Sequence, residues 1–312
     1  MKRIKTIKKA KFSIVKGGYF LLGEAITLLI LVILAVISFN PDSVKSADIE
    51  LKPTASIPPA IVASPSPSST TEPSPSPSLQ EEKPINHGRS IRIPILTYHY
   101  IGESSAQADQ VRFNLSVNPE QFSLQMEYLS EQGYHPIDLD TMLAGLSGAA
   151  ILPTKPIVIT FDDGYSDLYS SAFPILKKYN FKAVAFIPTG LVDTPNYATW
   201  DELSKMHSSG LISLQAHSVR HANLAAVSPE ILVNELTESK KTLEGKFGLP
   251  VNFVAYPYGS SNQVVWEAVK KAGYLGALGT WSSLIVTEGT IFNIPRVRIS
   301  GGTNLATFIS KL

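Results

Sequence analysis

The segment Lys155-Pro156-Ile157-Val158-Ile159-Thr160-Phe161, followed at once by Asp162-Asp163-Gly164, carries most of the information about how this chain folds. The run 155–161 is short, β-branched and almost continuously apolar, which predicts a strand buried on both faces of a parallel sheet. Two carboxylates follow its carboxyl end. Residues 211–216 have the same character and are followed by His217. Because ligands bind at the carboxyl ends of parallel strands, we expect both segments to meet in one pocket.

Two histidines four residues apart, His217 and His221, complement the carboxylates. Two imidazoles and one carboxylate suit a divalent ion such as zinc, and three protein ligands leave a coordination position open for water or substrate. A second carboxylate is what metal-assisted hydrolysis needs to take a proton from that water. Singly, an Asp-Asp-Gly turn and a histidine pair are common without any function. Their combination at two predicted strand ends favours a catalytic metal site.

The chain from residue 91 onward alternates between strand and helix patterns. Helices are expected to begin at Asn118-Pro119 and at Ser228-Pro229, because a capping residue followed by proline starts a helix. About 220 residues are enough for one domain with a substantial core. Further strands are predicted at 93–100, 182–187, 251–256, 274–278 and 294–299.

Three motifs, in this order, resemble those of the polysaccharide deacetylases, also called the NodB homology domain or carbohydrate esterase family four. They are Thr160-Phe161-Asp162-Asp163-Gly164, His217-Ser218-Val219-Arg220-His221 and Ala255-Tyr256-Pro257-Tyr258-Gly259. The resemblance covers about residues 91–312. It implies an α/β fold, a deformed (β/α) barrel, and metal-dependent removal of acetyl groups from N-acetylated sugars.

The resemblance also implies roles for the motif residues. It makes Asp162 the general base, and Asp163, His217 and His221 the ligands of a divalent metal ion, Zn in the first place with Co, Ni or Mn as alternatives. It makes the backbone N–H of Tyr258 a donor to the tetrahedral oxyanion. A rigid turn suits this task because the donor is fixed before charge develops.

Aromatic side chains and a proline beside the motifs are candidates for contact with the sugar. Large aromatic residues stack on sugar faces, and ordinary packing explains their presence equally well. The candidate substrate-binding residues are Tyr165, Trp200, Pro257 and Trp281.

The chain departs from the family pattern in its third motif. That motif usually begins with an arginine that holds the catalytic aspartate, and here the position is Ala255. Arg296 and Arg298 point to the same face of the predicted strand 294–299, because strands have a period of two. Arg296, directly after Pro295, is the candidate substitute, and an ordinary exposed arginine is the alternative.

A second departure concerns the general acid. The family usually supplies a histidine near the C-terminus, and no histidine follows His221. The pair Tyr98-His99, near the end of the predicted strand 93–100, resembles the Tyr-His segment at the start of the domain in the branch that includes poly-N-acetylglucosamine deacetylases. We therefore expect His99 to be the general acid, the alternative being a core histidine bonded to backbone. The other histidines are His87 in a linker, His135 in a predicted loop and His207 in a polar helix.

The N-terminal residues predict a membrane anchor. Residues 1–16 contain seven Lys or Arg and no acidic residue, and residues 17–39 are apolar apart from Glu24. At ~1.5 Å per residue this run spans a bilayer core of ~30 Å. The basic flank predicts a cytoplasmic N-terminus and an exported remainder. A cleaved signal peptide ending near Ala47 is the alternative.

Residues 40–90 are rich in Pro, Ser and Thr. This composition does not bury a core and predicts a disordered linker of polyproline II character. Its reach is on the order of 100 Å. Such a tether suits an enzyme that must meet an immobile polymer outside the membrane.

Charge and cysteine content narrow the function. The net charge of the chain is +1, and without the seven basic residues of 1–16 it is −6, which argues against a nucleic-acid partner. The absence of cysteine excludes a disulfide scaffold and a thiolate metal site. We expect an extracellular, membrane-tethered N-deacetylase that acts on peptidoglycan or poly-N-acetylglucosamine. A silent glycan-binding module is the alternative, and a glycosidase is disfavoured because adjacent strand carboxylates diverge.

Overall fold

A computed structural model describes residues 88–312 of the chain. Residues 1–87 lie outside the described residues, and with them the predicted cytoplasmic tail, the transmembrane anchor, nearly all of the linker and His87. From residue 88 onward, no helix has both the length and the apolar character needed to cross a bilayer. The predictions for the N-terminal region stay predictions.

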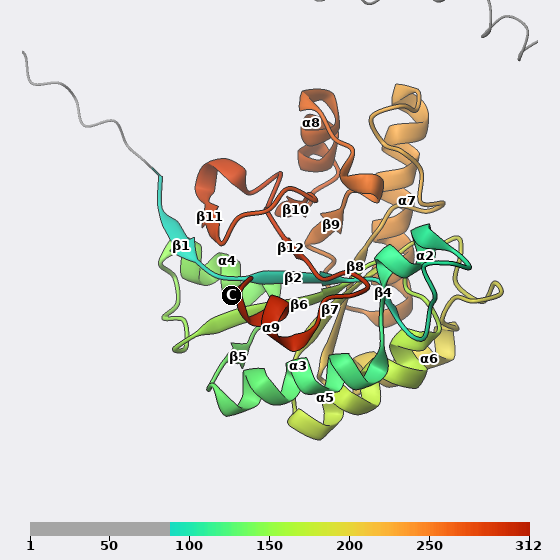
Figure 1. The fold of residues 1–312 in the computed structure, drawn as a ribbon. Helices are drawn as coiled ribbons and strands as arrows, with labels where there is room; N and C mark the ends of the chain where they lie inside the picture. The colour runs from blue at the N-terminus through green and yellow to red at the C-terminus, as the bar shows by residue number, and fades with distance from the viewer. Residues whose placement is uncertain (1–87) are drawn as a thin grey trace, which may run out of the picture. The chain divides into compact units, whose positions relative to one another are not determined.

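The fold is built on a curled parallel sheet (Figure 1). Its strands follow the order β10-β9-β8-β7-β6-β2-β12, and β5 pairs with β6 outside this path. Two small additional sheets pair β1 with β11 and β3 with β4. The strands are β1 (Ser90–Arg92), β2 (Ile95–Tyr98), β3 (Tyr100–Ile101), β4 (Ser116–Val117), β5 (His135–Pro136), β6 (Pro156–Phe161), β7 (Ala183–Ile187), β8 (Ile212–Ala216), β9 (Phe253–Ala255), β10 (Gly276–Leu278), β11 (Ile285–Thr287) and β12 (Val297–Arg298).

The two edges of the sheet are joined by the segment that leads into β12. Ile294 forms a parallel bridge with Leu278 of β10, while β12 itself pairs with β2. The N–H of Ile294 donates to the carbonyl of Ala277 at 2.8 Å, and the N–H of Gly279 donates to the carbonyl of Ile294 at 2.9 Å. The sheet is thus curled into a deformed half-barrel, which confirms the α/β architecture predicted for this part of the chain.

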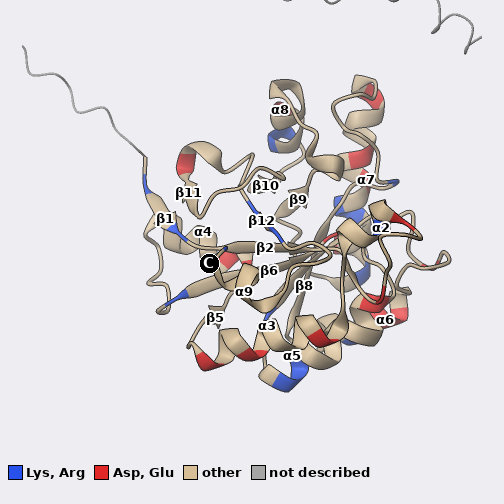
Figure 2. Cartoon of the chain, in the orientation of Figure 1, with Lys and Arg blue, Asp and Glu red and all other residues tan. Residues whose placement is uncertain are grey.

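Helices pack around the sheet (Figure 1), and most of the charged residues lie in these outer helices (Figure 2). As predicted, α3 begins after Asn118 and α7 after Ser228, whose side chains accept hydrogen bonds from backbone N–H groups of the first turn. The helices are α2 (Gln110–Leu115), α3 (Pro119–Glu131), α4 (Leu139–Ser147), α5 (Phe173–Tyr179), α6 (Trp200–Ser208), α7 (Pro229–Phe247), α8 (Gln263–Lys271) and α9 (Leu305–Ile309), with short helical turns η1 (Leu168–Ala172), η2 (Pro257–Gly259) and η3 (Glu288–Thr290).

Alternation along the strands divides the core into two clusters. On β2, Leu96 and Tyr98 belong to the larger cluster, which packs beneath the helices. Ile95 belongs to a smaller cluster inside the curled sheet, together with Val158 of β6 and Phe253 of β9. Because side chains of a strand alternate between its faces, β2, β6, β7, β9 and β10 each contribute to both clusters.

The inner face changes from apolar to polar toward the carboxyl ends of the strands. On β2 the period of two leads from Ile95 to Thr97 and then to His99, and on β6 it leads from Val158 to Asp162. The apolar layer fills the interior, and the polar layer lies where ligands bind in parallel sheets. The polar residues that the sequence placed at the carboxyl ends of the strands therefore lie at the edge of the sheet where a ligand is expected.

The structure differs from the sequence prediction at the last strand. The expected strand 294–299 is reduced to the two residues of β12. The cause is a change of partner, because Ile294 bridges to β10 before Val297 pairs with β2. His135, expected in a loop, lies in the short strand β5 and is exposed.

Candidate metal centre

A cavity of about 550 Å³ opens at the carboxyl ends of the central strands. It gathers the residues that the sequence assigned to catalysis and metal binding, although they come from five separate parts of the chain. Those that line it are His99, Asp162, Asp163, His217, His221, Tyr258 and Arg296.

Asp163, His217 and His221 each turn one ligand atom toward a common point. The three atoms lie within 4.8 Å of one another. The Nε2 atom of His217 is 3.2 Å from Oδ1 of Asp163, and that of His221 is 3.1 Å from the same oxygen. Nδ1 of His217 lies 2.8 Å from the carbonyl oxygen of Ala255. Donation from Nδ1 leaves the neutral ring with a lone pair on Nε2, aimed at the carboxylate.

Lone pairs that face each other at this distance need a cation between them, either a proton or a metal ion. Burial opposes protonation of His217, and the carboxylates of Asp163 and Asp162 outweigh it and raise the pKa of His217. Burial likewise opposes ionisation of Asp163, and His217 and His221 outweigh it, so that its pKa lies well below the usual range. The same field attracts a divalent ion. The triad therefore fits a metal site with two imidazoles and one carboxylate.

Backbone strain is concentrated at this centre. In residues 88–312, eight non-glycine residues have positive φ, and four of them belong to the motifs. A left-handed conformation of an ordinary residue costs ~1–2 kcal/mol, so it persists only where the surroundings impose it. The four are Asp163 (φ 69°), Ser218 (φ 63°), His221 (φ 56°) and Tyr258 (φ 61°).

Asp162 is held by Arg296 in a bidentate ion pair. Nη1 donates to Oδ1 and Nη2 donates to Oδ2, both at 2.7 Å, and Nε of Arg296 donates to the carbonyl of Gly279 at 2.9 Å. Both side chains are buried. Burial alone would raise the pKa of Asp162, but the guanidinium outweighs it and lowers that pKa. The carboxylate of Asp162 is thus ionised and fixed by Arg296, the candidate substitute for the motif arginine whose position Ala255 occupies.

His99 lies in the same cavity, beyond the end of β2. Its Nδ1 atom is buried and has no hydrogen-bond partner. Burial lowers the pKa of His99, against the opposing effect of Asp162 and Asp163. An alternative was a core histidine bonded to backbone, and the unpartnered nitrogen does not match it.

The candidate substrate-binding residues divide into two groups. Tyr165 lines the cavity, stacked on Tyr100 with ring centroids 3.6 Å apart. The other three do not line it. Trp200 packs against Phe247 on the outer helices, and Nε1 of Trp281 donates to the carbonyl of Asn293 at 2.8 Å. Pro257 is buried at the start of η2.

Sequence reasoning missed Glu235 of α7, which supports the histidine turn from behind. This fully buried carboxylate accepts hydrogen bonds from the N–H groups of Val219 at 2.8 Å and Arg220 at 2.9 Å, and also from Nε of Arg220. It fixes the loop between the two histidine ligands. The signal was its spacing, because Glu235 falls on the apolar stripe formed by Leu232 and Leu236.

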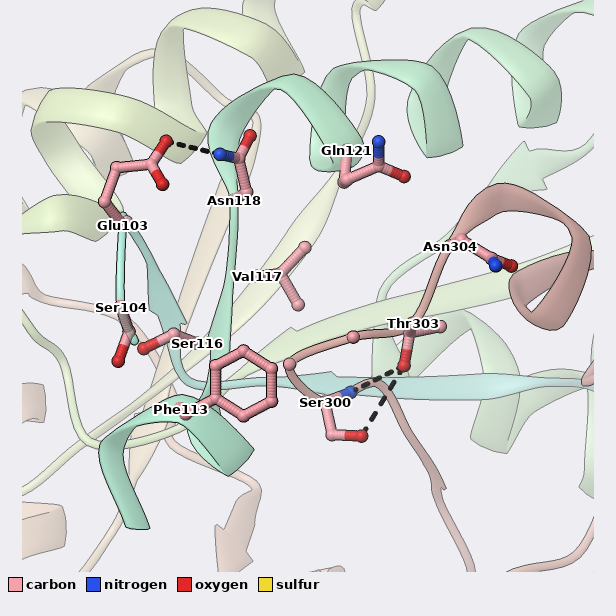
Figure 3. Close-up of a pocket in the computed structure, with 13 residues that line it drawn as sticks. Glu103, Ser104, Phe113, Ser116, Val117, Asn118, Gln121, Ser300, Thr303 and Asn304 are labelled. Carbon is pink, nitrogen blue, oxygen red and sulfur yellow. Dashed lines mark hydrogen bonds between the residues drawn. The ribbon is translucent and has the colours of Figure 1, made fainter. Parts of the chain in front are cut away.

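A second cavity, of about 240 Å³, lies beside α2 (Figure 3). Phe113 lies on the wall of this cavity, and four of the polar residues that line it are paired with one another. Asn118 donates to Glu103, and the hydroxyl of Thr303 accepts from the N–H of Ser300 (Figure 3). The residues that line it include no imidazole and no buried carboxylate.

Comparison with known proteins agrees with this geometry. The profile of the family described as polysaccharide deacetylase matches residues 150–277. The Streptococcus pyogenes deacetylase PplD, in complex with acetate, is 28% identical with a TM-score of 0.66, over 71% of this chain and 98% of that one. BA0330 from Bacillus anthracis, whose structure is described as that of a polysaccharide deacetylase, is 30% identical with a TM-score of 0.64, over 71% and 69%.

Curated relatives extend the comparison. A poly-beta-1,6-N-acetyl-D-glucosamine N-deacetylase of Staphylococcus aureus is 28% identical over 226 residues, which are 66% of this chain and 78% of the relative. The Escherichia coli enzyme of the same description is 26% identical, and the chain spans 40% of its length. Sequence, fold and site geometry agree, and the chain belongs to the polysaccharide deacetylase family of hydrolases.

Proposed function

We propose that this protein is a metal-dependent N-deacetylase that hydrolyses acetamide groups of an extracellular polysaccharide containing N-acetylglucosamine. The observation that carries the proposal is the meeting of a paired carboxylate, Asp162, with an Asp/His/His triad and His99 in one cavity. The names of the Staphylococcus aureus and Escherichia coli relatives support the substrate class. The basic and apolar residues 1–39 support a tether to the cell membrane, with the catalytic domain outside.

Asp163, His217 and His221 are the residues that would hold the metal ion. A bound divalent ion, Zn²⁺ by the chemistry of these ligands, supplies Lewis-acid polarisation of the acetyl carbonyl and lowers the pKa of water. Ala255 contributes through its carbonyl, which fixes the His217 ring by accepting from Nδ1. Glu235 keeps the loop that joins the two histidines in place.

Asp162 takes a proton from the water that attacks the acetyl carbon. Arg296 holds both carboxylate oxygens and lowers the pKa of Asp162, which keeps the base ionised before the substrate arrives. The backbone N–H of Tyr258 donates to the oxygen on which negative charge develops. The strained φ of Tyr258 fixes this donor in advance.

His99 gives a proton to the amine nitrogen as the carbon–nitrogen bond breaks and acetate leaves. A free amine anion is far too basic to depart unaided, so the step needs an acid. The lowered pKa of His99 makes its protonated form a stronger acid and reduces the amount of that form at neutral pH. The reaction consumes one water and yields acetate and the deacetylated sugar.

Release of acetate tests the proposal. The purified protein is incubated with oligomers of N-acetylglucosamine joined by β-1,4 or β-1,6 bonds, before and after removal of metal by a chelator and after its return. We expect acetate release that requires the metal. Binding of the oligomers without any acetate release, by protein that contains metal, supports the glycan-binding alternative instead.

A further inference from the structure

The cavity that contains the triad Asp163, His217 and His221 is called the metal cavity below. One charged side chain that lines it has no oppositely charged partner. The ionised side chains that line the cavity are Asp162, Asp163, Arg296 and Arg298. Arg296 is neutralised by Asp162, and Asp163 faces the two histidines. Arg298, which is exposed to the cavity, takes part in no ion pair between side chains of residues 88–312.

The place of Arg298 in the sheet brings it next to a second unpartnered group. Arg298 of β12 is the register partner of Thr97 on β2. Thr97 is 4% exposed, lines the same cavity, and its Oγ1 atom is buried without a hydrogen-bond partner. A buried hydroxyl without a partner costs free energy of folding, so a fold keeps it where a ligand completes the bond.

We propose that Arg298 and Thr97 form a carboxylate-binding subsite beside the catalytic residues. A guanidinium offers two parallel N–H donors that match the two oxygens of a carboxylate, and a hydroxyl donates to a remaining lone pair. A neutral sugar hydroxyl would satisfy Thr97 and leave the charge of Arg298 unbalanced. This inference rests on the proposed deacetylase function and narrows its substrate class.

Two carboxylates reach this position in a deacetylation reaction. One is a carboxyl group on the sugar next to the acetamido sugar, such as a lactyl ether. The other is the acetate that the reaction releases. The first source makes Arg298 a determinant of substrate choice, in favour of an alternating acidic glycan over a neutral homopolymer. The second makes it part of the product site.

The test compares matched substrates. One is an oligomer in which N-acetylglucosamine alternates with a lactyl-bearing sugar, and the other is its methyl ester, in which the same carboxyl group is uncharged. We expect wild-type kcat/KM to be higher for the acid than for the ester by roughly tenfold or more, the usual worth of a charge-assisted hydrogen bond. Arg298→Met should reduce this ratio to about one, since the carboxylate then loses its charged donors.

Two further variants refine the measurement. Arg298→Lys keeps the positive charge and loses the two parallel N–H donors of the guanidinium. The acid-to-ester ratio of kcat/KM should therefore fall but stay above one. Thr97→Val keeps the shape and removes the hydroxyl, and it should reduce the ratio by a smaller factor without lowering the thermal unfolding midpoint. Lys271→Met, on the outer helix α8 and away from the cavity lining, removes one positive charge as the matched control and should leave the ratio unchanged.

Inhibition by acetate separates the two sources of carboxylate. An unchanged acid-to-ester ratio with weaker acetate inhibition in Arg298→Met assigns the subsite to the product. No change in either quantity overturns the subsite, and turnover of a neutral oligomer in the same assay keeps the proposed function standing. If the wild-type protein turns over no substrate, the proposed function fails, and calorimetric binding of the acid and ester oligomers to wild type and Arg298→Met decides on the subsite.

Discussion

The metal cavity and the cavity beside α2 differ in whether the buried polar atoms that line them have hydrogen-bond partners. In the described residues, five buried side-chain atoms lack a hydrogen-bond partner, and three of them, on Thr97, His99 and Asp163, line the metal cavity. None lines the cavity beside α2, where Glu103 and Thr303 are engaged by neighbouring groups. Each unsatisfied buried group costs ~1–3 kcal/mol. Such groups therefore mark the cavity in which a ligand completes the bonds.

The two cavities differ in their backbone as well. Asp163, His221 and Tyr258 hold left-handed conformations at the metal cavity, whereas the left-handed residue on the wall of the other cavity is Gly302. Glycine adopts this conformation at no steric cost. Strain in ordinary residues thus accompanies the unsatisfied groups, and both features are absent from the cavity beside α2.

The largest effect is expected from His217→Ala. This change removes one of three ligands, so the protein should lose its metal and its activity together while the helical content is unchanged. Metal analysis of the purified variant and circular dichroism check this. Full metal content in the His217→Ala variant would show that His217 is not a metal ligand, and the contrast between the two cavities would lose its basis.

Asp162→Asn should lower the rate by a factor of about 10²–10⁴ with the metal retained, because the base is lost and the ligands remain. Asp163→Asn should instead lose affinity for the metal, because an amide is a poor zinc ligand. Metal content and acetate release measured on both variants separate the two roles. The reverse pattern would exchange the roles of the neighbouring carboxylates.

His99→Ala should lower the rate by roughly a hundredfold, the worth of a positioned general acid, with unchanged metal content. The wild-type rate should fall as pH rises through the pKa of His99, because the acid must be protonated, and this limb should lie below the ordinary histidine pKa since burial lowers it. The pH profile of the variant should lack that limb. A variant with near-normal rates would exclude His99 from proton transfer.

Glu235→Gln should destabilise the protein by ~1–3 kcal/mol, since a buried charged acceptor of three hydrogen bonds is weakened. The activity loss should be milder than in the variants above because no reacting group is removed. Urea unfolding gives the free energy change. Glu238→Gln, at a half-exposed position of the same helix, is the control.

The smallest effect is expected at the cavity beside α2. Glu103→Gln keeps a side-chain oxygen for Asn118 at an exposed position, so rate and metal content should stay within about twofold of wild type. A steady-state assay on the same oligomers checks this. A tenfold loss would mean that the second cavity takes part in catalysis and would end the contrast between the two regions.

Much of the barrel could be predicted because its strands are continuous apolar runs, as at 155–161 and 211–216, whose buried parallel character is visible in composition. The sequence also singled out Arg296 as the candidate substitute for the missing motif arginine, and Arg296 does bind Asp162. The role of Thr97 could not be predicted from the sequence, because the surrounding residues in the fold decide whether its hydroxyl has a hydrogen-bond partner. Trp200 and Trp281 misled because nearness to a motif in sequence does not fix the direction of a side chain.

The ion pair between Asp162 and Arg296 joins residues 134 positions apart, and Arg296 stands directly before a strand of only two residues. During synthesis His99 leaves the ribosome first and the arginine among the last residues of the domain. A nascent or C-terminally truncated chain therefore lacks the group that holds its base, whatever else has folded. Because a two-residue strand holds Arg296 with few ladder hydrogen bonds, we expect hydrolysis to stop at a lower denaturant concentration than the one that melts the helices. We therefore expect catalytic competence to be lost before the fold itself.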